Sequence, residues 1–146
     1  MQRLGLERQV RFTGWLDRAQ VAPRYREADL FTLVPRVESF GNSFLEALAS
    51  GLPIVGSHVG GIPELVEHAR NGMLVAPKRP RELAHAISYL AADPRLCAEI
   101  GRRNRGQAEQ KYSCHRVTSR YLSLYNGAAR HAPAHHPVAE LPSSSW

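Results

Sequence analysis

Short apolar runs alternate with helical patterns through the first half of the chain, and this alternation limits the fold more than any other feature. The apolar runs, which we interpret as strands, occupy residues 10–13, 30–34, 53–56 and 73–76. Each is bounded by Gly, Pro, Asp or Asn, residues that commonly end strands. Helical patterns stand between them, at residues 18–28, 43–50 and 62–68. Strands that alternate with helices are typical of a doubly wound α/β layer with a parallel sheet.

From Pro80 onward the pattern is helical only. We expect C-terminal helices over residues 81–92, 95–111 and 114–129. The last of these carries apolar residues along one face, namely Val117, Tyr121, Leu124 and Tyr125. The end of the chain is rich in Pro and Ser, so we expect a disordered tail over residues 131–146 and a single α/β domain over residues 1–130.

Composition excludes several classes of protein. No apolar stretch reaches the roughly 18 residues of a membrane-spanning helix, and the segment after Met1 lacks the apolar core of a secretory signal. Two cysteines, Cys97 and Cys114, are too few for a disulfide framework or a zinc site, so we expect a cytoplasmic protein.

The net charge of +6 lies mostly in residues 94–146, which carry eight basic and three acidic residues. No aromatic residues alternate with these basic residues as a single-strand-binding surface requires, so we expect no nucleic-acid partner. A basic helix can also contact a membrane surface, but nothing else in the sequence supports such contact. An ordinary solvated helix surface explains the charge as well.

Residues 35–66 contain the candidate site. A strand ends near Val34, a loop follows with Glu38 and Gly41, and a helix starts at Asn42, which we expect to be its N-cap. This arrangement puts free backbone N–H groups at the carboxyl edge of a parallel sheet. Together with the helix dipole, such groups hold an anion, usually a phosphate. Gly41 lets the backbone approach that ligand closely.

Two carboxylates flank this helix start. Glu46 lies about one turn inside the helix, where it can accept hydrogen bonds from a pair of sugar hydroxyls. The alternative is a negative charge that only favours the helix dipole. Glu38 lies in the preceding loop, nearer to where a sugar beyond a diphosphate would lie, and its alternative is an ordinary loop carboxylate.

A second loop, residues 58–64, follows the next strand and opens another short helix. Gly60 and Gly61 allow a tight turn there, with ligand contact or a purely steric role as the two interpretations. Pro63 fits the first turn of the helix, and we interpret Glu64 as an acid near a helix start. Both loops face the crevice at the carboxyl end of the sheet, where α/β proteins bind ligands.

One ordered set of motifs runs through this region. It reads ESFG at 38–41, FLEALA at 44–49, GLPIV at 51–55, GGIPE at 60–64 and NGMLV at 71–75. In this order the motifs resemble the donor-binding domain of retaining GT-B glycosyltransferases of the family 4 (group 1) type, whose E-x7-E motif has the spacing of Glu38 and Glu46. The resemblance extends over residues 9–126 and implies a partial Rossmann-like domain, the C-terminal one of such an enzyme.

The resemblance also implies roles for individual residues. Glu38 would be the catalytic residue, in contact with the transferred sugar, and Glu46 would bind the ribose of a nucleotide-sugar donor. The donor-binding residues would be Gly41, Asn42, Ser43, Glu46, Gly60 and Gly61, with the amides of the first three on the diphosphate. The family needs no metal ion, and the nucleotide sugar is its substrate, so we expect no cofactor.

The chain departs from this family before residue 9. An acceptor domain, two further strands and an Arg–Lys pair that neutralises the leaving diphosphate are not recognised in it. Loss of one such group typically costs roughly 10²–10³ in rate, so we expect the chain alone to be inactive. A complete enzyme would transfer a sugar, with retention, from a nucleoside diphosphate sugar to an acceptor hydroxyl. The alternatives are a non-catalytic remnant or nucleotide-binding module, half of a split enzyme, and a nucleotide-sugar epimerase of related architecture.

The resemblance leads to a prediction for the sheet. We expect about four parallel strands, with residues 10–13 paired directly with residues 30–34, followed by 53–56 and 73–76. An edge left unpaired would instead invite self-association or a separate chain that supplies the missing half. Because the two middle runs lack polar alternation, we expect them to be covered on both faces.

Overall fold

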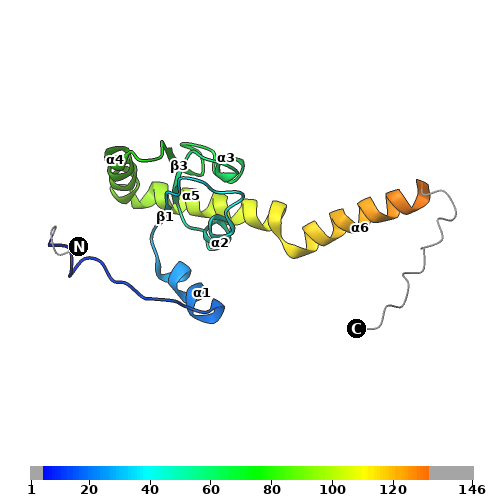
Figure 1. Ribbon diagram of the computed structural model, residues 1–146, viewed down its shortest axis with the longest axis horizontal. Helices are drawn as coiled ribbons and strands as arrows, with labels where there is room; N and C mark the ends of the chain where they lie inside the picture. The colour runs from blue at the N-terminus through cyan, green and yellow to red at the C-terminus, as the bar shows by residue number, and fades with distance from the viewer. Residues whose placement is uncertain (1–4, 132–146) are drawn as a thin grey trace, which may run out of the picture.

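The computed structural model describes residues 5–131, which form an α/β body and a long helical arm (Figure 1). The expected tail lies outside the described residues apart from His131. The elements in chain order are α1 (Arg18–Glu27), β1 (Phe31–Leu33), α2 (Asn42–Ala49), β2 (Ile54–Ser57), α3 (Ile62–Leu65), β3 (Gly72–Val75), α4 (Pro80–Ala91), α5 (Pro94–Gln107), the π-helical turn η2 (Ala108–Tyr112) and α6 (Cys114–His131).

The three strands form a parallel sheet in the order β1-β2-β3. Phe31 lies opposite Ile54, and Val55 lies opposite Met73. The expected α/β class, the alternation of strands with helices and the parallel pairing of the last three apolar runs are therefore confirmed. Because all three strands run the same way, the loops after β1 and β2 leave the sheet at one edge.

Residues 10–13 form no strand, so the prediction of a fourth strand paired with β1 was wrong. The segment before α1 runs outside the α/β body (Figure 1), and Phe12 and Trp15 in it are 80% and 87% exposed. A short strand is stable only when its backbone pairs and one of its faces is buried. Neither condition is met here, and among residues 5–131 β1 has no strand on its outer edge.

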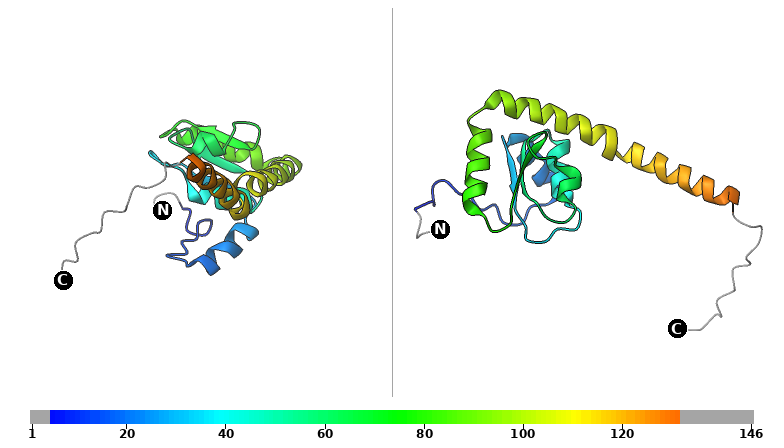
Figure 2. Two further views of the ribbon diagram at one scale, coloured as in Figure 1. Left: turned by 90° about the vertical axis from the view of Figure 1, so that its right-hand side faces the viewer. Right: turned by 90° about the horizontal axis from the view of Figure 1, so that it is seen from above.

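Two hydrophobic cores cover the two faces of the sheet. One lies under α2 and α3 and contains Phe44, Ala47, Leu48, Leu52, Ile54, Ile62, Leu65, Val66 and Ala108. The other lies under α4 and α5 and contains Val55, Val75, Ala86, Leu90 and Ile100. Figure 2 shows α4 on one side of the sheet and α2 with α3 on the other. Adjacent residues of β2 therefore point into opposite cores.

The two middle strands differ in how well they are covered. All four residues of β2 are buried, as expected for a strand with helices on both faces. β1 is only partly covered, because Thr32 and Leu33 are exposed, so the expectation that this run is covered on both faces was wrong. Within residues 5–131 β1 has a neighbouring strand on one edge, so it lies at the border of the sheet, where the helices cover it less completely.

The start of α2 differs from the expectation in one detail. The N-cap is Gly41, in a left-handed conformation with φ of 89°, and Asn42 is the first residue of the helix, with an exposed side chain. The predicted Asn42 cap was therefore wrong. A Cβ atom at position 41 would lie 2.8 Å from the ring of Phe44, so both the backbone angle and the space at this position favour glycine.

Buried polar side chains fix α5 to the opposite end of the sheet. Asn104 is fully buried and donates hydrogen bonds to the carbonyl oxygens of Leu52 and Asn71, at 2.7 Å and 2.9 Å. Asn71 in turn donates to the carbonyl of Leu65 and to the side chain of Gln107. These bonds hold α5 against the segments that lead into β2 and β3.

The helical arm of α5, η2 and α6 extends beyond the sheet (Figure 2). The expected helices at 95–111 and 114–129 are present, with a π-helical turn at the end of the first. The predicted apolar face of the last helix is also present, but it has no partner among the described residues. Its members Val117, Tyr121, Leu124 and Tyr125 are 40–69% exposed.

Candidate functional site

The two candidate loops meet at the carboxyl edge of the sheet. Ser57, at the end of β2, donates a hydrogen bond of 2.6 Å to the carbonyl oxygen of Pro35, just after β1. Gly60 and Gly61 lie directly against the backbone of residues 38–40, because a Cβ atom at either position would collide with it. The two loops therefore form one continuous surface, as the sequence predicted.

These contacts show a steric role for the two glycines. At Gly60, where φ is 52°, a Cβ atom would collide with the carbonyl oxygen of Glu38. At Gly61 it would lie 2.5 Å from the carbonyl oxygen of Ser39. The sequence allowed either ligand contact or a steric role for these glycines, and the structure shows the steric role. The glycines keep the loop of Glu38 next to the second loop.

The N-terminus of α2 presents free donors at this surface. The carbonyl of Gly41 accepts hydrogen bonds from the amides of Phe44 and Leu45, at 2.9 Å and 3.3 Å, and no side chain caps the helix. The amides of Asn42 and Ser43 have no acceptor within residues 5–131. Orphan amides at a helix start, together with the positive end of the helix dipole, can hold an anion such as a phosphate.

The side chain of Phe44 packs against the start of α2. Its side chain is fully buried, and its ring lies against both Gly41 and Gly56, where an added Cβ atom would be only 2.8 Å away. The ring of Phe31 meets it edge-on, with 5.4 Å between the ring centroids. The aromatic packing therefore leaves the first turn of α2 little freedom to move.

The carboxylate of Glu46 lies one turn further along α2 and is exposed. Its Oε2 atom accepts a hydrogen bond of 3.0 Å from the hydroxyl of Tyr25, on α1. The same hydroxyl lies 3.4 Å from the carbonyl oxygen of Ser43. Burial, the hydrogen bond to Glu46 and the charge of Glu46 together raise the pKa of Tyr25 from 10.0 to about 12.

Tyr25 gives a prediction for alkaline pH. Its pKa in the folded chain, about 12, lies above the ordinary value of 10.0, so the protonated phenol stabilises the fold below pH 10.0. This contribution is lost as the pH rises through the folded pKa. The difference in unfolding free energy between the wild-type chain and Tyr25→Phe should therefore shrink between these two pH values in urea titrations. A difference that stays constant would contradict this assignment.

Glu38 lies in the loop before α2 and is half-buried. Its Cγ atom lies beside Gly41, and within residues 5–131 its carboxylate makes no ion pair or hydrogen bond. Its backbone contacts the second loop, as described above. The carboxylate is therefore available to a ligand held between the loops and the start of α2.

Tyr25 is the residue of this site that the sequence did not predict. It lies 21 positions before Glu46, and no spacing rule connects the two. The sequence contains one indication of its role. Tyr25 is the one aromatic residue in α1, a polar helix in which no residue is completely buried. An aromatic ring in such a helix marks the side that faces the rest of the protein.

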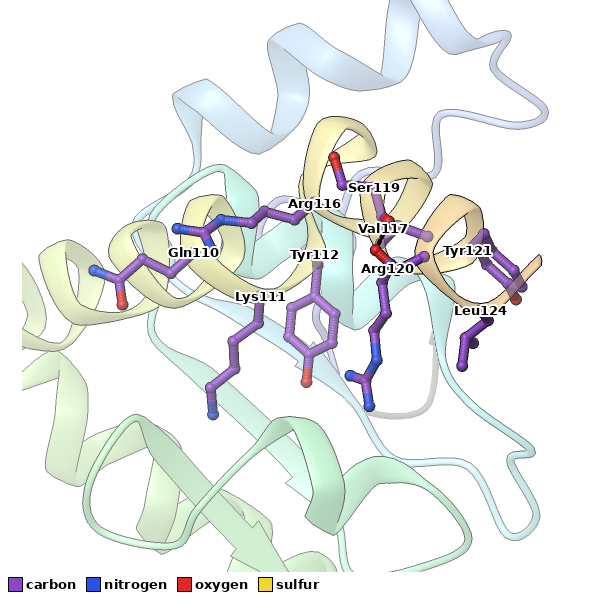
Figure 3. A pocket seen from close by; sticks show the side chains of 10 residues that line it. Gln110, Lys111, Tyr112, Arg116, Val117, Ser119, Arg120, Tyr121 and Leu124 are labelled. Atoms are coloured by element: carbon purple, nitrogen blue, oxygen red, sulfur yellow. Dashed lines mark hydrogen bonds between the residues drawn. The ribbon is translucent and has the colours of Figure 1, made fainter. Parts of the chain in front are cut away.

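The rest of the described chain holds no second candidate site of this kind. No group of three or more His, Cys, Asp or Glu residues lies close enough to hold a metal ion among residues 5–131. No helix in this part is long and apolar enough to cross a membrane. A hollow of about 920 Å³ lies along η2 and α6, where Lys111, Tyr112 and Arg120 point to the same side (Figure 3). It lies on the helical arm, apart from the two loops.

The chain is similar in sequence to known proteins. The model of the family "Glycosyl transferases group 1" matches residues 1–93. Over 130 residues the chain is 32% identical to N-acetyl-alpha-D-glucosaminyl L-malate synthase of Bacillus anthracis, and this match covers 89% of the chain and 34% of the synthase. The chain spans about a third or less of the length of the curated relatives that it matches.

Solved structures resemble the fold over most of the chain. Sucrose-phosphate synthase of Thermosynechococcus elongatus superposes with a TM-score of 0.83 at 28% identity, over 90% of this chain and 33% of the synthase. Alr3699/HepE of Anabaena, in complex with UDP, superposes with a TM-score of 0.81 at 31% identity, over 86% of this chain and 34% of that protein. The same Anabaena protein is also known in complex with UDP-glucose.

Proposed function

The chain belongs to the group 1 glycosyltransferase family, and from this premise we propose that it forms the part of such an enzyme that binds a nucleotide-sugar donor. The observation that carries the proposal is the uncapped start of α2 between two carboxylates, Glu38 and Glu46. As part of a complete enzyme, this unit would serve the transfer of a sugar, with retention, from a nucleoside diphosphate sugar to an acceptor hydroxyl.

Each residue of the site has a defined task in this proposal. The amides of Gly41, Asn42 and Ser43 hold the diphosphate, for which the first turn of α2 has donors without acceptors. Glu46 accepts hydrogen bonds from the ribose hydroxyls, since its second oxygen has no hydrogen-bond donor within residues 5–131. Glu38 contacts the transferred sugar as the catalytic residue.

Gly60 and Gly61 border the donor in this proposal, from the second loop. The two glycines also keep Glu38 in place through their contacts with its loop. The UDP and UDP-glucose complexes of the Anabaena protein support a nucleotide-sugar ligand for this type of fold.

The proposal includes no resident metal ion or other cofactor. The sequence has no Asp-x-Asp motif, and backbone amides together with the helix dipole supply the positive potential for the diphosphate. We also propose the cytoplasm as the compartment of this protein. Its two cysteines, Cys97 and Cys114, are both free thiols, which suits a reducing environment.

Titration calorimetry with UDP tests the proposed function. The wild-type chain should bind UDP, and Glu46→Ala should weaken binding roughly 10- to 100-fold, because it removes charged hydrogen-bond acceptors from the ribose. Glu99→Ala is the matched control, since Glu99 is an exposed glutamate on α5 whose carboxylate forms an ion pair with Arg103, away from the two loops. It should leave the affinity for UDP unchanged.

Two results would contradict the proposed function. The first is a folded wild-type chain that shows no UDP binding, which would favour a remnant that has kept the fold alone. The second is an unchanged affinity of Glu46→Ala. Thermal unfolding of each variant checks that the substitutions leave the chain folded. Glu46 is exposed, so we expect a small change in stability.

A further inference from the structure

The contact between Tyr25 and Glu46 joins α1 to α2, and the other side-chain hydrogen bond between these two helices within residues 5–131 comes from the same Tyr25 hydroxyl. Tyr25 lies in the last turn of α1, and Glu46 lies in the middle of α2. The distance from the phenol oxygen to Oε2 is 3.0 Å, which lies within the range of O–H···O hydrogen bonds. The carbonyl of Ser43 is farther from the hydroxyl, at 3.4 Å, so the charged carboxylate is the stronger acceptor.

Packing holds the phenol in place. The ring of Tyr25 is half-buried and lies against Phe31, with 5.9 Å between the ring centroids. Phe31 packs in turn on Phe44, whose ring lies against the first turn of α2. A row of three rings therefore runs from the core to the hydroxyl. The position of the hydroxyl is thus set by the core rather than by the solvent-exposed surface of α1.

Glu46 has no comparable restraint of its own. Its side chain is exposed, and the Tyr25 hydroxyl is the one hydrogen-bond partner of its carboxylate among the described residues. A free glutamate side chain samples many rotamers and must give up this freedom when it binds a ligand. The bond from Tyr25 restricts one oxygen and leaves the other oxygen, together with the remaining lone pairs, open to hydroxyl donors.

We propose that Tyr25 is a positioning residue that holds the Glu46 carboxylate ready for the ribose hydroxyls of the donor; this inference rests on the proposed function. Tyr25 itself does not touch the nucleotide. Its hydroxyl stays protonated at neutral pH and so remains a donor to the carboxylate. Its effect is to remove, before binding, part of the conformational freedom that Glu46 would otherwise lose on binding.

The test compares UDP, which carries a ribose, with inorganic pyrophosphate, which does not. In titration calorimetry, Tyr25→Phe should weaken UDP binding roughly 3- to 10-fold, because one long side chain is no longer held in place. Pyrophosphate should bind both proteins equally, since it contacts only the amides. Tyr89→Phe is the matched control, because Tyr89 is 53% exposed on α4. It should change neither affinity.

A double-mutant cycle separates positioning from a general effect on the fold. In the Glu46→Ala background, adding Tyr25→Phe should cost no further UDP affinity. Equal UDP affinities of the wild type and Tyr25→Phe would overturn the inference while the proposed function stands. An equal loss for UDP and pyrophosphate would also overturn it, because it would show a structural change in α2. If the wild-type chain does not bind UDP at all, the proposed function is wrong and this inference falls with it.

Discussion

Phe44→Ala should lower the free energy of unfolding by about 3–5 kcal/mol, the usual cost of truncating a buried phenylalanine. Phe44 is fully buried and is the largest side chain of the core under α2. Its ring fills the space between Gly41 and Gly56, so its loss leaves a cavity that neither glycine can fill. Urea unfolding followed by circular dichroism measures the change.

Phe12→Ala is the control, because Phe12 is 80% exposed in the segment before α1. The same change of residue there should alter the unfolding free energy by less than about 0.5 kcal/mol. A similar loss at both positions would show that Phe44 does not have the packing role described here. UDP binding should also weaken in any Phe44→Ala protein that remains folded, since the start of α2 loses the aromatic ring on which it packs.

Gly60→Ala should be nearly as costly, at about 3 kcal/mol, and should also remove UDP binding. The new methyl group would collide with the carbonyl oxygen of Glu38, and alanine also disfavours the left-handed backbone at this position. The chain can relieve the clash only by moving one loop away from the other. That movement displaces Glu38 and opens the surface at the carboxyl edge of the sheet.

Gly106→Ala is the matched control for this substitution. Gly106 lies inside α5, and a Cβ atom added there would meet no atom within 4 Å, so alanine should stabilise the chain by about 0.5–1 kcal/mol. Urea titrations measure the stability of Gly60→Ala and Gly106→Ala, and calorimetry measures their affinity for UDP. An unchanged stability and UDP affinity of Gly60→Ala would show that the two loops are not packed as described.

The sequence allowed the central part of the fold to be predicted because that part depends on local rules. Gly and Pro residues bound the strands, and the patterns between them have helical spacing, so α2, β2 and β3 could be located before the structure was known. The meeting of the loops at one edge followed from parallel strands alone. Gly60 and Gly61 could be recognised as special, but only the structure shows that they contact the backbone of the first loop.

Three features could not be predicted, and all of them depend on tertiary contacts. The run at residues 10–13 has the composition of a strand, but composition does not say whether a paired edge is available to it. The hydrogen bond from Tyr25 to Glu46 joins residues on different helices, and its existence depends on how α1 packs against the row of rings. The cap at Gly41 was missed for a similar reason, since the close approach of Phe44 decides it.

The weak burial of α1 has a consequence for the kinetics of the site. None of its residues is completely buried, so α1 should detach and reattach more often than α2, without unfolding of the rest of the chain. Each detachment would release Glu46 from its hydrogen bond. Hydrogen exchange should therefore be faster in the amides of α1 than in those of α2, and a nucleotide bound to Glu46 should slow it. The rate at which α1 opens would then set how often the carboxylate loses its alignment.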